Sequence, residues 1–365
     1  MKTTLSRNKK ARVIAYYLPQ YHPIPENNTW WGNGFTEWTN VVKARPLFKG
    51  HVQPKMPADL GFYDLRLAET RIAQAHLAAE AGIEGFCYWH YYFGNGKRLL
   101  ERPFNEVLSS GKPDFPFCLA WANHSWYKKT FDNTGDDELL IKQEYGGPDD
   151  YSNHFYDMRA AFLDPRYMKI NGKLIFVIFD SMGFEDFPVF KHLWNELAQK
   201  EGLEGFTFIG YSHREADNQK ILDLGYDYVN VNRLSAYFEQ ESFLQRKWTS
   251  LFRRWFKRGR FIHYDQASKT FTNATDAQRQ IIPSIIPNWD HSPRSGKKFH
   301  NFYGANPESF SKQVGAALEN ISNKDHEEKI LFLKSWNEWG EGNYMEPDEE
   351  FGRGYIDALR NALEK

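Results

Sequence analysis

Two glutamates near the C-terminus, Glu338 and Glu341, lie three positions apart and are flanked by tryptophans and glycines. They follow the apolar run Ile330–Leu333, so we expect them where a buried strand gives way to a loop. Burial of a carboxylate is costly unless it is compensated, so acids crowded beside large rings are seldom there for stability alone. In sugar-cleaving sites one carboxyl keeps its proton while the other stays ionised, and this pair suits that chemistry.

The structural alternative for the same pair is that one glutamate caps a loop while the other pairs with an arginine. We favour the catalytic interpretation, because the position after a strand and the Trp and Gly neighbours agree with it. Glu346 is a third acid close by, and we interpret it as structural. The sequence therefore predicts Glu338 and Glu341 as the catalytic residues.

The elements that must position this pair alternate along the chain between apolar runs and helical segments. Most of the eight runs are continuously apolar, as expected for strands covered on both faces. They span 12–18, 83–89, 115–121, 173–179, 206–211, 226–231, 281–287 and 330–336. The helical segments span 65–81, 98–109, 150–162, 190–200, 214–224, 239–257, 307–319 and 354–363. This alternation predicts an α/β fold, a (β/α)8 TIM barrel with long loops after its strands.

We expect one barrel domain over residues 12–365, after a disordered tail at 1–11. A doubly wound open sheet is the alternative, but no Gly-x-Gly-x-x-Gly follows an early strand. The 46 basic and 47 acidic residues leave a net charge of −1, which gives no global field to attract nucleic acid. The two cysteines, Cys87 and Cys118, exclude a disulfide scaffold and favour a reducing compartment. Without a signal peptide or a membrane-spanning run, we expect a cytoplasmic protein.

The C-terminal ends of the predicted strands combine aromatic rings with amides, imidazoles and carboxylates. Active sites of such barrels lie at these ends, so the pattern predicts a polar groove lined by rings that stack on sugars. An aromatic content of 17% with a mean hydropathy of −0.67 fits rings in a wet setting. The expected substrate-binding residues are Tyr16, Tyr17, Trp31, Glu37, Trp38, Trp89, His90, Trp121, Asn123, Tyr211, Trp289, Trp336, Asn337 and Tyr344.

Three of these residues belong to a long loop at 28–38, after the first strand. Long loops inside a barrel are usually functional, and its tryptophans and glycines suit a lid that stacks on sugars. The alternative is a loop packed down by its own rings. Glu37, in the same loop, can accept hydrogen bonds from sugar hydroxyls.

Four histidines, His90, His124, His213 and His291, fall near predicted strand ends. Their spacing fits neither His-x-His nor His-Glu-x-x-His, so we expect hydrogen bonding rather than metal ligation. We accordingly predict no metal and no cofactor.

The segment 243–261 interleaves seven basic residues with apolar ones at helical spacing. One interpretation is peripheral contact with an anionic membrane, at its cytoplasmic face, or with a polyanionic glycan carrier. The preferred alternative is an outer helix of the barrel with a solvated cationic face.

Three motifs carry a resemblance to a known family. They are Tyr16-Tyr17-Leu18-Pro19-Gln20-Tyr21-His22-Pro23, the segment from Trp31 to Val41, and Trp336-Asn337-Glu338-Trp339-Gly340-Glu341-Gly342. Together they resemble the WbsX family, which is encoded with genes for lipopolysaccharide O-antigen and other surface polysaccharides and is labelled a glycosyltransferase. That family is similar in turn to glycoside hydrolase family 99, the retaining endo-α-mannosidases, which are (β/α)8 barrels without a required metal.

The second resemblance implies roles for the two glutamates. Glu338 would deprotonate the substrate 2-hydroxyl, which attacks the anomeric carbon to form a 1,2-anhydro sugar. Glu341 would act as general acid on the leaving oxygen and then as base towards water. The related hydrolases usually have histidine where this chain has Gly340, a departure that bears on the identity of the sugar.

Three functions follow from these observations. The first is a glycosidase-like enzyme acting on α-linked mannose or a related sugar, with a glycan or a lipid-linked oligosaccharide as substrate. The second is a glycosyltransferase in O-antigen assembly, although no metal-chelating Asp-x-Asp follows a strand. The third is a glycan-binding barrel without catalysis, against which the presence of both Glu338 and Glu341 argues.

Overall fold

Eight parallel strands close into a barrel in the computed structural model, which describes residues 9–128, 137–240, 242, 247, 248, 251, 255, 260–296 and 301–364. The ring closes because β1 pairs with both β2 and β14. The barrel strands are β1 (Arg12–Tyr17), β2 (Gly85–Tyr92), β4 (Phe117–Trp121), β8 (Lys173–Ile178), β9 (Phe206–Ser212), β10 (Tyr228–Val231), β12 (Ile281–Ile285) and β14 (Ile330–Leu333). All eight predicted strands, and with them the predicted barrel, are confirmed.

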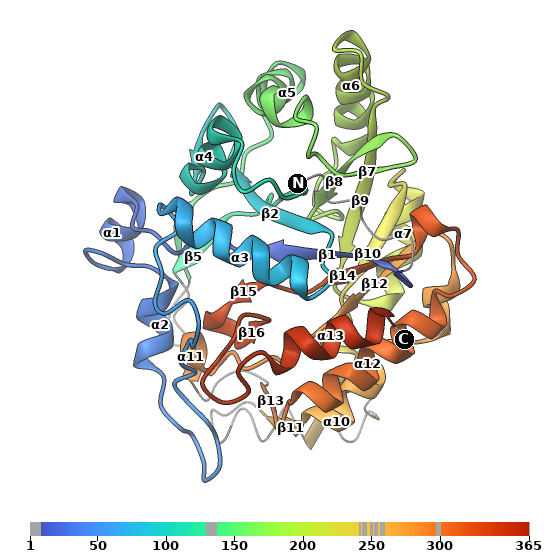
Figure 1. The fold of residues 1–365 in the computed structure, drawn as a ribbon. Coiled ribbons are helices and arrows are strands. Elements are labelled where there is room, and N and C mark those ends of the chain that lie inside the picture. Colours follow the sequence, from blue (N-terminus) through green and yellow to red (C-terminus); the bar gives the residue numbers. More distant parts are fainter. Residues whose placement is uncertain are drawn as a thin grey trace.

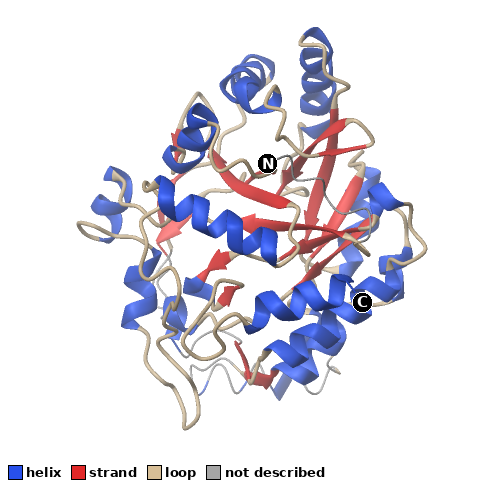
Figure 2. Ribbon diagram, viewed as in Figure 1, coloured by secondary structure: helices blue, strands red, loops and turns tan. Residues whose placement is uncertain are grey.

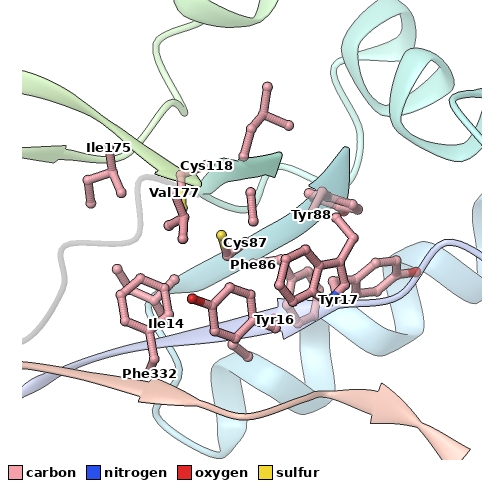
Figure 3. Packing of buried hydrophobic residues seen from close by; sticks show 14 of the residues in the cluster. Ile14, Tyr16, Tyr17, Phe86, Cys87, Tyr88, Cys118, Ile175, Val177 and Phe332 are labelled. Atoms are coloured by element: carbon pink, nitrogen blue, oxygen red, sulfur yellow. The ribbon is translucent and has the colours of Figure 1, made fainter. Parts of the chain in front are cut away.

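The barrel interior explains why these runs are continuously apolar. Every residue of β2, β4 and β14 is buried, because one face lines the interior and the other packs under helices. Tyr16 and Phe332 meet inside the barrel with ring centroids 4.9 Å apart (Figure 3). Cys87 and Cys118 lie opposite each other on β2 and β4 as buried free thiols. The strands therefore build a packed core rather than a pore.

Helices surround this barrel (Figures 1 and 2). The main ones are α3 (Ala68–Glu80), α4 (Arg102–Ser110), α5 (Pro148–Phe162), α6 (Phe187–Lys200), α7 (Asn218–Asp223), α12 (Pro307–Asn320) and α13 (Gly354–Glu364). Shorter elements in the connections are β3 (Arg98–Leu99), β5 (Trp126–Lys128), β6 (Glu138–Ile141), β7 (Lys169–Ile170), α8 (Ala236–Glu239), β11 (Phe261–His263), α10 (Tyr264–Ala267) and β13 (Asn301–Tyr303). None of the helices in the described ranges is long and apolar enough to cross a membrane.

Two predicted helices differ from the observed ones. The helix expected at 98–109 begins only at Arg102, because Arg98–Leu99 extends the sheet by pairing antiparallel with the end of β2. Leu100 follows with a positive φ of 59°, which separates strand from helix. The helix expected at 214–224 is a 3-10 turn, Glu215–Asp217, followed by α7. The segment 243–261 and the N-terminal tail fall largely outside the described residues.

The segments after the strands gather at the end toward which β1 points (Figure 1). They include α1 (Pro25–Trp31), α2 (Glu37–Lys43), α11 (Ser292–Ser295), β15 (Asn337–Glu338), the 3-10 helix η6 (Trp339–Glu341) and β16 (Asn343–Tyr344). The predicted loop at 28–38 is thus largely two short helices. Residues far apart in the sequence meet here, because parallel strands all end on one face of the barrel.

Gly85, at the start of β2, tests how tightly the barrel is packed. A Cβ there would lie 2.5 Å from the Pro116 carbonyl oxygen and 2.6 Å from Met168 Sδ. We expect Gly85→Ala to lower the free energy of unfolding by about 1–3 kcal/mol, measured by urea denaturation. Gly315→Ala is the control, because Gly315 is exposed on α12 with no atom within 4 Å of an added Cβ. It should be neutral or stabilise by up to about 1 kcal/mol; equal losses would contradict the packing argument.

Candidate active site

A cavity of about 840 Å³ opens at the C-terminal ends of the barrel strands, and Glu338 and Glu341 lie on its wall. Its lining is mainly aromatic, with a small set of charged and polar groups, as in other small-molecule sites. The rings come from five connections and from the strands β2 and β9. They are Trp31, Phe35, Trp89, Tyr91, Trp126, Tyr127, Phe179, Tyr211, Phe238, Trp289 and Phe302.

The turn that carries the two glutamates is fixed to the barrel by Asn337. Its side-chain oxygen accepts from Leu18 N at 2.8 Å, and its amide donates to Leu18 O at 3.0 Å. Gly342 then takes the left-handed conformation, with φ 56°, that ends η6. Asp290 N donates to the carbonyl of Glu341 at 2.8 Å. These bonds orient both carboxylates toward the cavity.

Arg294, on α11, lies between three carboxylates. Its Nη1 donates to Glu338 Oε1 at 3.2 Å and to Glu341 Oε1 at 2.5 Å. Its Nε and Nη2 contact Glu37 Oε2 at 3.1 and 3.0 Å. One planar guanidinium thus partly compensates three acids that repel one another. No group of three or more histidine, cysteine or acidic side chains in the described part of the chain is arranged to hold a metal ion.

The charges and the burial of this cluster shift the pKa values of Glu338 and Arg294. Burial raises the pKa of Glu338, and the charge of Glu341 adds to the rise, while Lys334 and Arg294 oppose it. Burial alone would lower the pKa of Arg294, but its three carboxylate neighbours raise it well above the usual value. The guanidinium is therefore charged, and Glu338 is the acid that gains a proton more readily than usual.

Gly340 leaves the space in which Glu37 and Arg294 meet. A Cβ on Gly340 would overlap Glu37 Oε2 and lie 3.1 Å from Arg294 Nε. A side chain at Gly340 would therefore require the Glu37 carboxylate to shift away from Arg294. Gly340 thus lies beside a charged pair at the edge of the turn that carries Glu338 and Glu341.

Seven of the sixteen residues expected from the sequence line this cavity. They are Trp31, Glu37, Trp89, Tyr211, Trp289, Glu338 and Glu341. Of the four histidines, His124, His213 and His291 are lining residues as well. The structure therefore brings together the glutamate pair and residues from the first, second, fifth and seventh strand connections.

The other nine expected residues lie outside the cavity, which corrects the expectation that each ring at a strand end faces substrate. They are Tyr16, Tyr17, Trp38, His90, Trp121, Asn123, Trp336, Asn337 and Tyr344. Successive side chains of a strand point to opposite faces, so neighbours in sequence separate in space. Trp89 lines the cavity, whereas His90 contacts His154 of α5, with 2.8 Å between their Nε2 atoms. Burial lowers the pKa of both histidines, so this pair is neutral.

Several of these nine residues support the cavity from beneath or from behind. Tyr16 stacks under Trp89 at 4.7 Å, and its hydroxyl donates to Asn230 Oδ1 at 2.8 Å. Tyr17 points the other way and donates to Gln74 Oε1 at 2.6 Å (Figure 3). These two tyrosines are adjacent in sequence but occupy opposite faces of β1.

The remaining rings and amides of this set hold the connections together. Trp38 donates from Nε1 to Tyr63 O at 2.8 Å, and Tyr344 stacks on Trp339 at 3.7 Å. Two further side chains donate to backbone carbonyls as Trp38 does. Trp121 Nε1 donates to Tyr92 O at 2.7 Å, and Asn123 Nδ2 donates to Asp180 O at 3.1 Å. Trp336 is fully buried in the core. Each satisfies a backbone group or fills the core, so none reaches into the cavity.

Glu346 is buried behind the catalytic turn. Its carboxylate accepts from Tyr63 Oη at 2.8 Å, Gln74 Nε2 at 2.6 Å and Trp339 Nε1 at 2.6 Å. Burial raises its pKa to about 7, although these hydrogen bonds act in the opposite direction. This position agrees with the structural interpretation, because Glu346 anchors the tryptophan between the two glutamates.

Arg294 and Lys334 are the functional candidates that sequence reasoning missed. Both line the cavity. Arg294 follows the seventh strand within a polar stretch, so no pattern separates it from a solvated loop residue. Lys334 offered a signal, because a lysine directly after the apolar run Ile330–Leu333 is placed at the end of a buried barrel strand.

Comparison with known proteins identifies relatives of this chain. A family profile described as "Glycosyltransferase WbsX" matches residues 13–359. Two proteins of Xanthomonas campestris pv. campestris, strains B100 and ATCC 33913, both called "Uncharacterized protein WxcX", are each 31% identical over 99% and 97% of this chain. The chain spans about half the length of these relatives, 51% and 50%.

Solved structures share the fold at low identity. A glycoside hydrolase-like protein superposes with a TM-score of 0.63 and 16% identity, over 98% of this chain and 95% of its own. The family 99 endo-alpha-mannosidase from Bacteroides thetaiotaomicron, in complex with BIS-TRIS-propane, has a TM-score of 0.57 and 14% identity, over 97% and 96%. These likenesses agree with the closed barrel described above.

Filling the space beside Gly340 tests whether that space is needed by the Glu37–Arg294 pair. We expect Gly340→Ala to lower the free energy of unfolding by about 1–3 kcal/mol, because the new methyl overlaps the Glu37 carboxylate. Adding Glu37→Ala removes the overlapped group, so the double variant should lose less than the sum of the two single losses. Urea unfolding of the four proteins measures this coupling. Additive losses, within about 0.5 kcal/mol, would show that Gly340 is not reserved for Glu37.

The raised pKa of Glu346 predicts a pH-dependent stability. In the folded protein Glu346 keeps its proton until about pH 7, whereas the ordinary pKa of a glutamate is 4.5. Between these two pH values the folded state binds more protons than the unfolded state. The stability that this proton contributes is therefore fully present below about pH 4.5 and is lost as the pH rises through about 7. The loss amounts to about 3 kcal/mol, and Glu346→Gln should lack it in urea titrations at about pH 5 and about pH 8. Glu308→Gln, exposed on α12, should follow the wild type; the same loss in Glu346→Gln would contradict the assignment.

Proposed function

The chain belongs to the glycosyltransferase WbsX family, and from that premise we propose that it is a carbohydrate-active enzyme of bacterial surface polysaccharide metabolism. Its substrate would be an α-linked, mannose-like glycan of the O-antigen type, and it would act with retention of anomeric configuration. The observation that carries this proposal is the contact of Glu338 and Glu341 with one guanidinium inside a ring-lined cavity at the mouth of a barrel.

The spacing of the two carboxylates supports the retaining outcome. Both oxygens contact Arg294 Nη1, at 3.2 and 2.5 Å, so their separation cannot exceed the sum of these distances. That bound lies below the roughly 6.5–9.5 Å found between the carboxyl groups of inverting glycosidases, which must admit a water molecule between acid and base. The separation of these two Oε1 atoms is therefore shorter than the inverting arrangement requires.

In the proposed mechanism the nucleophile is the sugar's own 2-hydroxyl. Glu338 accepts its proton while the oxygen attacks the anomeric carbon, and the bond to the leaving oxygen breaks to give a 1,2-anhydro sugar. Glu341 donates a proton to the leaving oxygen and then takes one from the water, or acceptor hydroxyl, that opens the anhydro ring. As the ring opens, Glu338 returns its proton to the 2-oxygen, which restores the 2-hydroxyl. The raised pKa of Glu338 supports its role as base, because a base works best when its pKa approaches the operating pH.

Arg294 must change its contacts during this cycle. Arg294 Nη1 lies 2.5 Å from Glu341 Oε1, so the guanidinium occupies one oxygen of the carboxyl that would donate the proton. For Glu341 to act as an acid, substrate binding has to draw the guanidinium away, toward Glu37 or toward sugar oxygens. The contact of Nη2 with Glu37 at 3.0 Å offers a place for the charge in that state.

Transfer rather than hydrolysis is the second candidate, and the family description favours it. The closed parallel barrel argues against a doubly wound nucleotide-sugar site. A transferase on this barrel would therefore use a glycan donor, with an acceptor hydroxyl in place of water at the second step.

The test is proton NMR of the purified protein with α-mannose-containing polysaccharides, including the surface polysaccharide of its source organism. We expect new reducing ends that appear first in the anomeric configuration of the substrate. Glu341→Gln and Glu338→Gln should each lower turnover by about 10²–10⁴-fold while the glycan still binds. Glu308→Gln serves as the matched control and should turn over like the wild type.

Other results in this experiment would replace the proposal. Release of a nucleoside diphosphate from a nucleotide sugar, dependent on an acceptor, would make the protein a nucleotide-sugar transferase. Turnover that is unchanged in Glu341→Gln would remove its role as acid. Binding without turnover in the wild type would leave a glycan-binding barrel.

A further inference from the structure

Lys334 is a buried cation on the cavity wall with no hydrogen-bond or ion-pair partner among the residues that the structure describes. The residue is 8% exposed and directly follows β14. Its ammonium lies over the ring of Trp289, 5.6 Å from the centroid. The two nearby glutamates each place one oxygen, Oε1, against Arg294. Lys334 is thus held on the cavity wall, and none of the described residues accepts a hydrogen bond from its ammonium.

Lys334 lines the cavity, so the hydrogen-bond partners of its ammonium come from whatever occupies the cavity. The neighbours keep the charge in place: burial would lower the pKa of Lys334, but Tyr211 and the two glutamates raise it. A cation kept charged and unpaired in a cavity indicates an anionic group of the ligand.

The surroundings of Lys334 add a second free donor. Tyr211 also lines the cavity, and its hydroxyl oxygen accepts from Asn232 Nδ2 at 2.5 Å. The hydroxyl proton has no acceptor in the described part of the protein, so it can be donated into the cavity. His213, beside them, is neutral at pH 7, because burial and then the charge of Lys334 lower its pKa to about 4. This part of the cavity therefore offers two donors, one of them the cation Lys334, with Glu338 and Glu341 close enough to raise the pKa of that cation.

We propose that Lys334 Nζ and the Tyr211 hydroxyl form a subsite for the carboxylate of an acidic sugar, such as a hexuronic acid, in the substrate. A carboxylate has two oxygens that only accept, which matches two donors that have no hydrogen-bond acceptor among the described residues. The opposite charges of an ammonium and a carboxylate attract each other, so Lys334 favours the acid over the uncharged parent hexose. That the ligand is a glycan rests on the proposed function; that it is acidic rests on Lys334 and Tyr211.

The test compares matched pairs of small sugars by calorimetry or ligand-observed NMR. The probes are the methyl α-glycosides of mannuronic, glucuronic and galacturonic acid, each against its parent hexoside, which differs only in a hydroxymethyl group at the carboxylate position. We expect wild-type protein to bind at least one acid about tenfold or more tightly than its parent. Lys334→Met should abolish this preference, so that acid and parent hexoside bind with similar affinity, and Lys334→Arg should keep part of it.

A second variant keeps the test valid if Lys334→Met does not fold. Tyr211→Phe removes one hydroxyl and should reduce the preference severalfold, with Lys334 intact. The proposal is overturned if no acid binds more tightly than its parent hexoside, and this includes the case in which none of the probes binds measurably. It is equally overturned if Lys334→Met keeps the preference. Because binding is read without turnover, a preference for acids would stand even if the NMR assay finds no catalysis, so the two proposals fail separately.

Discussion

The contact of one guanidinium with three carboxylates organises this end of the barrel. Glu37, Glu338 and Glu341 come from two distant segments, and their mutual repulsion in a buried setting would separate them without Arg294. The cation holds α2, α11 and the turn that carries Glu338 and Glu341 at one point. Gly340 is part of the same constraint, because a Cβ there would overlap the Glu37 carboxylate.

The same arrangement bears on the proposed reaction. The guanidinium bonds both of the glutamates that we propose as catalytic, yet a general acid has to carry a proton. Glu37 offers Arg294 a third carboxylate, which has no part in the proposed chemistry. Lys334 lies on the same cavity wall, and none of the described residues forms an ion pair with it. One cation therefore holds the three carboxylates together, and we propose that the other binds the ligand.

Much of the fold could be predicted from the sequence, because the burial of an element determines the pattern of apolar residues along it. Strands covered on both faces read as continuous apolar runs, and all eight were found in this way. Helix boundaries were less accessible, as at Arg98–Leu99, where a pairing with the end of β2 overrides local helical pattern. Rings at strand ends were a poorer guide to the site. Trp38, Trp121 and Trp336 are as aromatic as Trp89, but they bond backbone groups or fill the core.

The sequence by itself determined that eight strands alternate with helices and that Glu338 and Glu341 follow the last of them. These features are local, since each depends on residues that are neighbours along the chain. Only the tertiary structure decided which side chains share the cavity, because that depends on the face of each strand and on contacts across hundreds of residues. Arg294 shows the difference most clearly. Nothing adjacent in sequence marks it, and its role exists only because barrel closure brings the seventh and eighth connections to Glu37 of the first.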